Sequence, residues 1–560
     1  MDARLLIAPL VCAAAIAAPR PEPIMPLSEV KPGMTGVWRT CVAGTTVTSF
    51  PMRVVGLQPN IIYPGESVIL CEALDAQNKH SGPVAGMSGS PVYIKGRIVG
   101  AYAYGSTAQK DQALFMATPI ELMLKMGTLP RTAPVQGFSL PSPGNEGDES
   151  SLTPLFVSGL GPRALALMDQ RFRSLGMRTY AAGSVAGAAR RCAELKPGSP
   201  VAGVILHGDI AAAAVGTVTY RDENTIYAFG HPFTRSGAIE MPMAGAEMLA
   251  VSHSVSRSFK VGNIGPIVGT IQQDRSPAVV GTIGRMPAMM DIRVRSRHPV
   301  LGEREYVCKG IRHRELSAEA VLTAVLDPLM QGLDAIGPRT VRYALTFTLD
   351  SGETIGITNV AADSSANMMI AMSALSVMGE CLSAPYVTVG VRSCSVDLSF
   401  SEELRKAEIT RAWVSATTVS AGSSFDVALE LQPFKGSRSI RTVPVHVPAE
   451  TEPGTYSVAV CDADRADSID GSMASRATTL PGLVRTLATM RTSDRVYVKL
   501  LGTSAGLVIE GAAMPGLPPS ALMRWRSDAA KPLAETTLAE SELPLDAVVH
   551  GSHQLSITVK

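Results

Sequence analysis

Short apolar runs separated by turn residues fill the N-terminal part of the chain. Two of these runs, at 91–94 and 98–102, flank a glycine-containing turn and predict a β-hairpin. An apolar stretch at 120–126 follows Thr118 and Pro119, so we expect a helix with Thr118 as its cap and Pro119 in its first turn. The pattern predicts a β-rich unit that ends in one short helix.

The pattern changes several times further along the chain. A stretch rich in proline and glycine at 129–152 predicts a linker, and residues 153–345 predict a second β-rich unit with a few helices. Residues 346–385 predict a connecting helical segment. From there on, short strands alternate with polar turns, which predicts an immunoglobulin-like β-sandwich over 386–475 and a C-terminal β domain over 476–560.

Composition narrows the classes of function. The 560 residues suffice for three to four domains of about 150 residues each. Lys and Arg number 50 and Asp and Glu 49, a net charge of +1, so the chain lacks the basic character that nucleic-acid binding requires. The sequence contains no Walker loop, no glycine-rich dinucleotide fingerprint after a strand and no His-Glu-x-x-His. We therefore expect neither a metal nor a cofactor.

The N-terminus has the features of a secretory signal peptide. Arg4 precedes an apolar run from Leu5 to Ala18 that is too short to span a bilayer and ends in small residues. We therefore expect residues 1–19 to be removed and the mature chain to be exported. No later segment is an uninterrupted apolar run of transmembrane length, so no integral membrane segment is predicted in the mature chain.

The cysteines leave two interpretations open. Eight occur, without a Cys-x-x-Cys pair or a Cys/His cluster at metal-binding spacing. Cys41 with Cys71, or Cys381 with Cys394, can form disulfides in an oxidising compartment. Buried free thiols are the alternative.

A turn rich in glycine and serine carries the strongest chemical signal. It reads Gly86-Met87-Ser88-Gly89-Ser90-Pro91 and leads directly into the predicted hairpin. Glycine permits backbone angles that are closed to other residues, so Ser88 can lie exposed on a sharp turn. The backbone N–H groups of Gly86 and Met87 can then converge on one point, as an oxyanion hole requires. These features predict a nucleophilic Ser88, and an ordinary Gly/Ser turn is the alternative.

A serine nucleophile needs a base, and one of the nine histidines stands in a suitable context. His231 lies in Phe229-Gly230-His231-Pro232, directly after the predicted strand 226–228. A histidine on a loop that a strand holds in place suits general-base catalysis. A structural or surface role is the alternative for any single histidine.

Together the two motifs resemble the SpoIVB family of bacterial serine peptidases, whose active site is trypsin-like. Residues 86–91 match the nucleophile loop of that family, and residues 216–220, which precede His231, are similar to the strand that leads to its catalytic histidine. The resemblance covers about residues 26–126 and 200–300. It implies a trypsin-like double β-barrel that acts on a protein or peptide substrate.

Chain order and the third member of the triad depart from the family pattern. Ser88 precedes His231 by 143 residues (231 − 88), whereas in the sporulation protease the histidine comes first, so we expect a barrel assembled in permuted order. The acid that the resemblance implies falls at Ala73. Asp75, two residues later, and Asp209, upstream of His231, are the candidates, and a Ser–His dyad without an acid is a further alternative.

These expectations combine into one architecture and two functions. The architecture is mainly β: a trypsin-like double β-barrel in permuted order, with a Ser-bearing half at 20–128, a His-bearing half at 153–345 and C-terminal β-sandwich domains. The first function is an exported serine endopeptidase of the bacterial periplasm, envelope or medium that works through an acyl-enzyme. The alternative is a non-catalytic binding or scaffold protein with the same fold.

Overall fold

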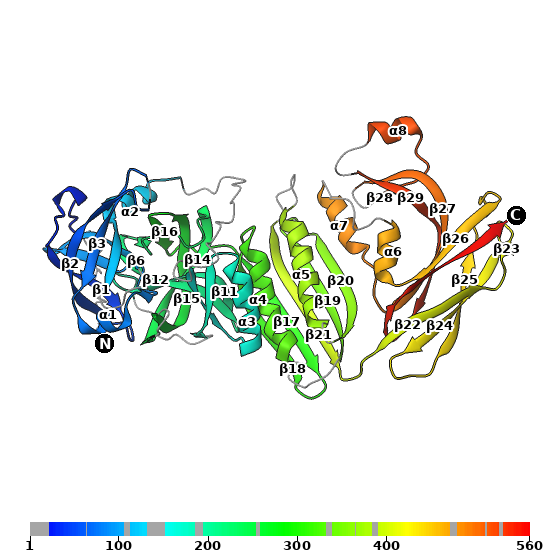
Figure 1. Ribbon diagram of the computed structural model, residues 1–560, viewed down its shortest axis with the longest axis horizontal. Coiled ribbons are helices and arrows are strands. Elements are labelled where there is room, and N and C mark those ends of the chain that lie inside the picture. Colours follow the sequence, from blue (N-terminus) through cyan, green and yellow to red (C-terminus); the bar gives the residue numbers. More distant parts are fainter. Residues whose placement is uncertain are drawn as a thin grey trace, which may run out of the picture.

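The computed structural model is an elongated molecule in which four β-rich parts follow one another along the chain (Figure 1). The structure describes residues 22–62, 64–105, 113–130, 152–184, 194–253, 258–331, 339–363, 366–383, 390–470, 479–509, 512–525 and 530–560. Strands dominate all four parts, which confirms the predicted mainly β fold class.

The first part is a closed barrel of six strands in the order β1-β2-β3-β7-β6-β5. Its core is aromatic: the indole ring of Trp38 lies 4.9 to 6.0 Å from the ring centroids of Phe50, Tyr102 and Phe115. The elements of this part are η1 (Leu27–Glu29), β1 (Thr35–Cys41), β2 (Val47–Pro59), β3 (Ser67–Ala73), α1 (Ala76–Ser81), β4 (Val84–Ala85), β5 (Pro91–Ile94), β6 (Arg97–Gly105), β7 (Leu114–Pro119) and α2 (Ile120–Gly127). The predicted hairpin is β5–β6, and the predicted helix at 120–126 is α2.

The second part contains another closed circuit of strands. Successive antiparallel pairings run from β11 through β14, β15, β16, β13 and β12 back to β11. The elements of this part are β8 (Thr153–Ser158), α3 (Pro162–Arg173), β9 (Met177–Ala181), β10 (Gly183–Ser184), β11 (Pro200–Gly208), β12 (Ala211–Asp222), β13 (Thr225–Ala228), β14 (Gly237–Ser252), β15 (Ser258–Arg275) and β16 (Ala278–Ile283). We call this circuit the second ring. The short strand β4 pairs in parallel with β15, so the second ring is joined to the first barrel just before Gly86.

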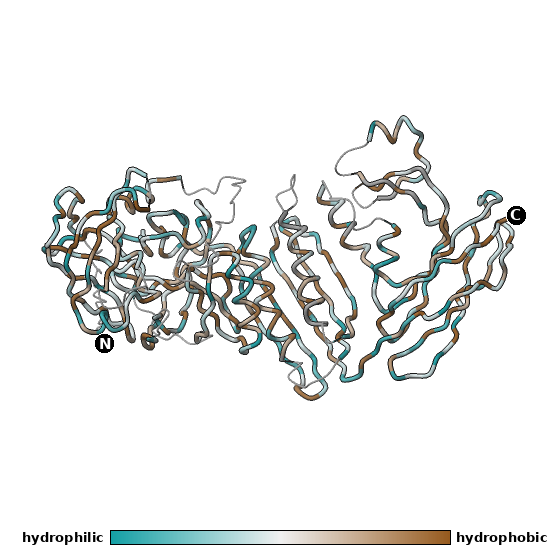
Figure 2. The backbone as a smooth tube through the Cα atoms, in the orientation of Figure 1, coloured by the Kyte–Doolittle hydropathy of each residue, from teal (hydrophilic) through white to brown (hydrophobic). Residues whose placement is uncertain are grey.

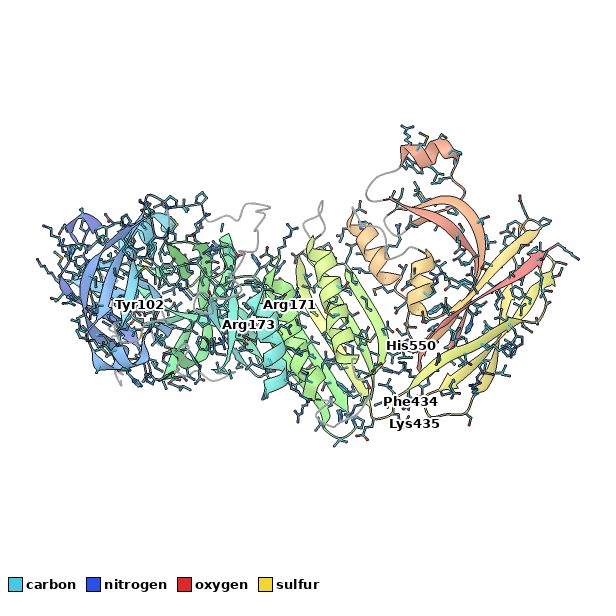
Figure 3. All side chains as sticks on the ribbon, in the orientation of Figure 1. Tyr102, Arg171, Arg173, Phe434, Lys435 and His550 are labelled. Atoms are coloured by element: carbon cyan, nitrogen blue, oxygen red, sulfur yellow. The ribbon has the colours of Figure 1, made fainter. Side chains whose placement is uncertain are left out.

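The third part extends the sheet of the second ring through the pairing of β18 with β11. Helices α4 and α5 pack together on its strands, and α3 is joined to α4 by the ion pair between Arg171 and Glu319 (2.9 Å), with Arg171 and Arg173 visible on α3 in Figure 3. The elements of this part are β17 (Met289–His298), β18 (Gly302–Ile311), α4 (Leu316–Gln331), β19 (Arg339–Leu349), β20 (Thr354–Asp363), α5 (Ala366–Ser383) and β21 (Val391–Ser401).

The fourth part is a pair of sheets around one hydrophobic core, and hydrophobic and hydrophilic positions alternate along its strands (Figure 2). The alternation is that of strands with one buried face. The elements are β22 (Lys406–Val414), β23 (Thr418–Val419), β24 (Ser424–Pro433), β25 (Ser439–His446), β26 (Gly454–Cys461), α6 (Ala463–Asp470), α7 (Leu480–Ala488), β27 (Arg495–Ile509), β28 (Ala512–Met514), α8 (Pro519–Arg524), β29 (Ala530–Pro544), β30 (Val548–His550) and β31 (Ser552–Val559).

The boundaries predicted for several segments differ from the way the strands pair in the structure. Strands β19 and β20 pair across the boundary expected at residue 345, so the segment 346–385 supplies a strand as well as a helix. Strands from both 386–475 and 476–560 contribute to the single core of the fourth part. Local periodicity does not report such pairings because the partners are far apart in the sequence. The predicted signal peptide at 1–19 lies outside the described residues, as does nearly all of the predicted linker at 129–152.

The described residues test two further expectations, which concern disulfides and membrane-spanning segments. Cys41 and Cys71 are buried free thiols rather than a disulfide, and Cys394 is also free and buried. None of the helices that the structure describes has both the length and the apolar character needed to cross a membrane.

Candidate functional site

The predicted nucleophile loop connects β4 with β5, and two glycines set its shape. Gly86 and Gly89 have left-handed φ angles of +91° and +96°. A Cβ atom on Gly89 would lie 2.0 Å from the carbonyl oxygen of Thr217 and 2.5 Å from the backbone nitrogen of Phe229. Only glycine fits this approach, so the loop from the first barrel lies directly against β12 and the residue that follows β13 in the second ring.

Ser88 is the one residue between 84 and 90 that is not buried. Its carbonyl oxygen accepts a hydrogen bond from the N–H of Thr217 at 2.8 Å, which holds the backbone in place. Its Oγ donates to the carbonyl oxygen of Ala103 over a long 3.5 Å. By contrast, the hydroxyl of Ser90 is buried and donates to the Met87 carbonyl oxygen at 2.6 Å. The loop therefore presents one serine hydroxyl, that of Ser88, in a weakly bonded state.

Some backbone N–H groups of the loop already donate a hydrogen bond within the described part of the protein, whereas one does not. The N–H of Met87 donates to Val84 at 3.1 Å, and that of Gly89 donates to Tyr102 at 2.7 Å. Within the described residues, the N–H of Ser88 has no hydrogen-bond acceptor. Of the amides near the nucleophile, Met87 is thus already occupied, and the Ser88 amide is available to an oxyanion.

His231 follows a backbone turn that ties the second ring to the first barrel. Phe229 and Gly230 both have left-handed φ angles, +67° and +69°, which is unusual for the bulky Phe229. A Cβ atom on Gly230 would lie 3.0 Å from Cβ of Ala101 and 3.1 Å from Cβ of Ala103, both on β6. The His231 turn therefore lies against β6 at the residue whose carbonyl oxygen accepts from Ser88.

The predicted role of Thr118 as a helix cap is wrong. Thr118 does not cap helix α2, which has Pro119 at its N-cap position and no side-chain cap. The hydroxyl of Thr118 instead donates to the carbonyl oxygen of Gly230 at 2.7 Å. The hydroxyl is used to hold the His231 turn against β7, and this contact across 112 residues has no trace in the local sequence.

The imidazole of His231 is oriented by its own loop. Its Nδ1 lies 2.8 Å from the carbonyl oxygen of Pro232. A carbonyl oxygen only accepts, so Nδ1 carries the proton and Nε2 is the nitrogen that can accept one. The ring is partly exposed and lies between the rings of Tyr104 and Phe229, with centroid distances of 5.9 and 6.0 Å. This is the tautomer that a general base requires.

The two candidate acids make other contacts. Asp75 caps helix α1: its carboxylate accepts from the backbone N–H of Asn78 at 2.8 Å and from the Asn78 side chain at 2.9 Å. Asp209, in the turn between β11 and β12, accepts from the N–H of Val307 at 2.7 Å. Among the described residues, neither carboxylate bonds to His231. The carbonyl oxygen of Pro232 stands where a triad would place an acid.

The sequence interpretation passed over a buried carboxylate beside His231. Asp274, at the end of β15, is 1% exposed and accepts from the N–H groups of Phe233 and Thr234, both at 2.6 Å. It also accepts from the Thr234 hydroxyl at 2.7 Å and from the N–H of Ser236 at 3.3 Å. Asp274 thus fixes the loop that follows His231. Its position at the end of a strand, next to Arg275, offered only the signal of an ordinary turn.

The site is built from protein groups alone. Nowhere in the described part of the chain do three or more His, Cys, Asp or Glu side chains gather as a metal site would require. What the geometry offers is the hydroxyl of Ser88, the imidazole of His231 with its proton on Nδ1, and the N–H of Ser88, which has no acceptor among the described residues. No family model, no curated protein and no solved structure matches this chain.

Proposed function

We propose that this chain is an exported serine endopeptidase of the SpoIVB type, with Ser88 as nucleophile and His231 as general base. The observation that supports it is the meeting of the two loops at Ala103 of β6, although 143 residues (231 − 88) separate them in the sequence. Each loop carries its functional residue as a partly exposed group on an otherwise buried turn. Rigid placement of both groups on a strand framework is what nucleophilic catalysis needs.

The chemistry follows from these groups. Ser88 Oγ attacks the scissile carbonyl carbon while Nε2 of His231 takes the hydroxyl proton, and the carbonyl oxygen becomes an oxyanion. The N–H of Ser88 receives that oxyanion, with Gly86 as the second predicted donor, since the N–H of Met87 is already bonded to the carbonyl oxygen of Val84. Collapse breaks the C–N bond, and His231 gives its proton to the leaving amine. Water then hydrolyses the acyl-enzyme by the same proton transfers in reverse order.

Of the residues that the structure describes, Ser88 and His231 form the catalytic unit in this proposal. The Pro232 carbonyl oxygen fixes the tautomer of His231, which is one of the tasks of a triad acid. Ser88 Oγ bonds to Ala103 rather than to His231, and a turn of the Ser88 side chain upon substrate binding would complete the dyad.

Covalent labelling tests the proposal directly. The full chain is treated with a fluorophosphonate probe, and Ser88→Ala and His231→Ala are expected to lose the label and the cleavage of casein. Ser90→Ala is the matched control, because its buried hydroxyl is two residues away and is expected to leave labelling in place. Unchanged casein cleavage by Ser88→Ala would overturn the proposal.

A second function is supported by one observation. Neither Asp75 nor Asp209 orients His231, and the only hydrogen bond of Ser88 Oγ among the described residues goes to a carbonyl oxygen. A binding or scaffold protein with this fold would have the same geometry without turnover. Absence of labelling in the unmodified chain, together with retained folding, would favour that function.

A further inference from the structure

Lys260 is a fully buried lysine beneath the Ser88 loop. It lies near the start of β15 with 0% of its surface exposed. Its Nζ donates to the hydroxyl of Thr40 at 2.7 Å and to the hydroxyl of Thr217 at 3.3 Å. Among the described residues it forms no salt bridge. A buried ammonium without a counter-ion is costly, so its presence calls for a role other than stability.

The hydroxyl of Thr217 connects Lys260 with the Ser88 loop by hydrogen bonds. It lies 3.3 Å from Nζ of Lys260 and donates to the carbonyl oxygen of Gly86 at 3.1 Å. An ammonium group only donates, so the Thr217 hydroxyl accepts from Lys260, and its own hydrogen goes to the Gly86 carbonyl oxygen at 3.1 Å, which is nearer than the Thr40 hydroxyl at 3.5 Å. The protonated lysine thereby sets the direction of the whole chain of hydrogen bonds.

The aliphatic part of Lys260 also contacts the loop. A Cβ atom on Gly86 would lie 3.3 Å from Cβ and from Cδ of Lys260, so the lysine stem supports the left-handed turn at Gly86. The peptide that follows Gly86 has its oxygen held by Thr217 and its hydrogen, on Met87, held by Val84. Fixing this peptide plane fixes the orientation of the next amide, that of Ser88.

We propose that Lys260 is a positioning residue, which orients the Gly86–Met87 peptide through Thr217 and so holds the Ser88 hydroxyl and amide in place. This inference rests on the proposed peptidase function for its effect on catalysis, but its structural part stands without it. The bonds of Nζ go to Thr40 and Thr217, and none goes to Ser88, so Lys260 acts through the loop and is not itself the base.

Ionisation of Lys260 near neutrality makes the inference measurable. Burial lowers the pKa of Lys260 to about 7, and the Cys41 thiol, whose own pKa burial raises, is the titratable group that acts on it. The remaining partners, Thr40, Thr217 and Gly86, carry no charge. Above that pKa the neutral amine can accept from Thr217, and the Thr217 hydrogen is then free to leave Gly86.

Two threonine variants separate the relay from simple packing. Thr217→Val and Thr40→Val each remove one buried hydroxyl from Lys260, but only Thr217 continues to Gly86. We expect Thr217→Val to slow fluorophosphonate labelling of Ser88 about tenfold and Thr40→Val to slow it less than about twofold. Thr217→Ser, which keeps the hydroxyl, is expected to restore the rate. Equal slowing by both valine variants would overturn the relay.

The pH profile and amide exchange complete the test. The labelling rate of the unmodified chain is divided by that of Thr217→Val, so that the effect of His231 ionisation, which both proteins share, drops out. This ratio should be largest below pH about 7 and decline above it. A flat ratio would overturn the role of the Lys260 charge.

If the unmodified chain is not labelled at all, the peptidase function fails, and hydrogen exchange of the amides at 84–90 decides the inference. Faster exchange in Thr217→Val than in Thr40→Val supports it, and equal exchange refutes it.

Discussion

The molecule buries charged side chains in two opposite ways. In the fourth part, whose two facing sheets we call the sandwich, Lys499 is fully buried, and its ammonium group lies 2.8 Å from Asp470 and 2.9 Å from Glu540. In the second ring, Lys260 and Asp274 lie near the two ends of β15 and are as deeply buried, yet within the described ranges they bond to hydroxyl and amide groups only. The sandwich neutralises its buried charge, whereas the candidate site keeps charges that are held by dipoles.

The difference separates an arrangement that serves stability from one that serves orientation. A buried ion pair satisfies both partners, and its field cancels within a few ångströms. A buried charge held by dipoles costs more, but it directs the hydrogen bonds of every group around it. Lys260 and Asp274 direct the loops of Ser88 and His231 respectively, so one strand, β15, governs both halves of the site.

Removing the charge of Lys499 should have the largest effect on stability. Lys499→Met removes the fully buried cation from Asp470 and Glu540 and leaves Arg491 as their remaining partner, which is expected to cost about 3 kcal/mol and to unfold the sandwich first. Urea unfolding followed by the fluorescence of Trp413 measures this loss. Lys309→Met is the control, because its pair with Asp291 is exposed and is worth less than about 1 kcal/mol.

Acid should reproduce part of that loss in the unmodified chain. Burial alone raises the pKa of Asp470, but hydrogen bonds and charge from Lys499 and Arg491 outweigh it and leave the pKa below its usual value. A lowered pKa means that the carboxylate contributes stability above its unfolded pKa and loses it as the pH falls through the folded value. Lys499→Met should flatten this acid dependence between pH about 5 and 2, and an unchanged slope would contradict the compensation.

Removing the charge of Lys260 should have the opposite effect on stability and raise the free energy of unfolding. Because burial lowers the pKa of Lys260 to about 7, the unfolded chain binds the proton more tightly, and the unmodified protein gains stability as the pH rises from about 7 to about 10. Lys260→Met removes that penalty and should stabilise the first two parts at pH 7 by roughly 2 kcal/mol while slowing the labelling of Ser88. Urea unfolding at pH 6, 8 and 10, read from the fluorescence of Trp38, tests it; lower stability at every pH would refute the argument.

Neutralising the carboxylate of Asp274 should chiefly affect orientation. In Asp274→Asn one oxygen becomes an amide nitrogen, so some of the N–H groups of Phe233, Thr234 and Ser236 lose their acceptor. We expect labelling of Ser88 to slow about tenfold, since the loop that carries His231 loosens, with a loss of stability of about 1 to 2 kcal/mol. The rate with a small probe, compared with Thr234→Val, shows whether charge or a single hydroxyl contact matters. A rate equal to that of the unmodified chain would remove Asp274 from the site.

The sequence predicted the parts of this site that are local. The glycines of 86–89 and the strand before His231 indicated a turn with an exposed hydroxyl and a turn with an imidazole, and both occur where expected. Lys260 escaped because its strand reverses the usual pattern: Ser258, Lys260 and Gly262 are buried, whereas Phe259 and Val261 are only partly so. Alternation alone would place the aromatic and aliphatic residues inside. The pairing of β15 with β4, more than 170 residues apart, creates this polar interior and has no local signal.

The smallest effect is expected at Asp75, which sharpens the contrast between a carboxylate that organises the site and one that only caps a helix. Asp75 is partly exposed, and its acceptors are used by Asn78 within the same helix. Asp75→Ala should cost about 1 kcal/mol, the value of an N-cap, and leave the labelling rate of Ser88 within about twofold. Asp75→Asn retains capping and should restore the stability without altering the rate. A loss of labelling in both variants as large as in Asp274→Asn would make Asp75 the triad acid after all, because only a shared loss of negative charge would then explain the two rates.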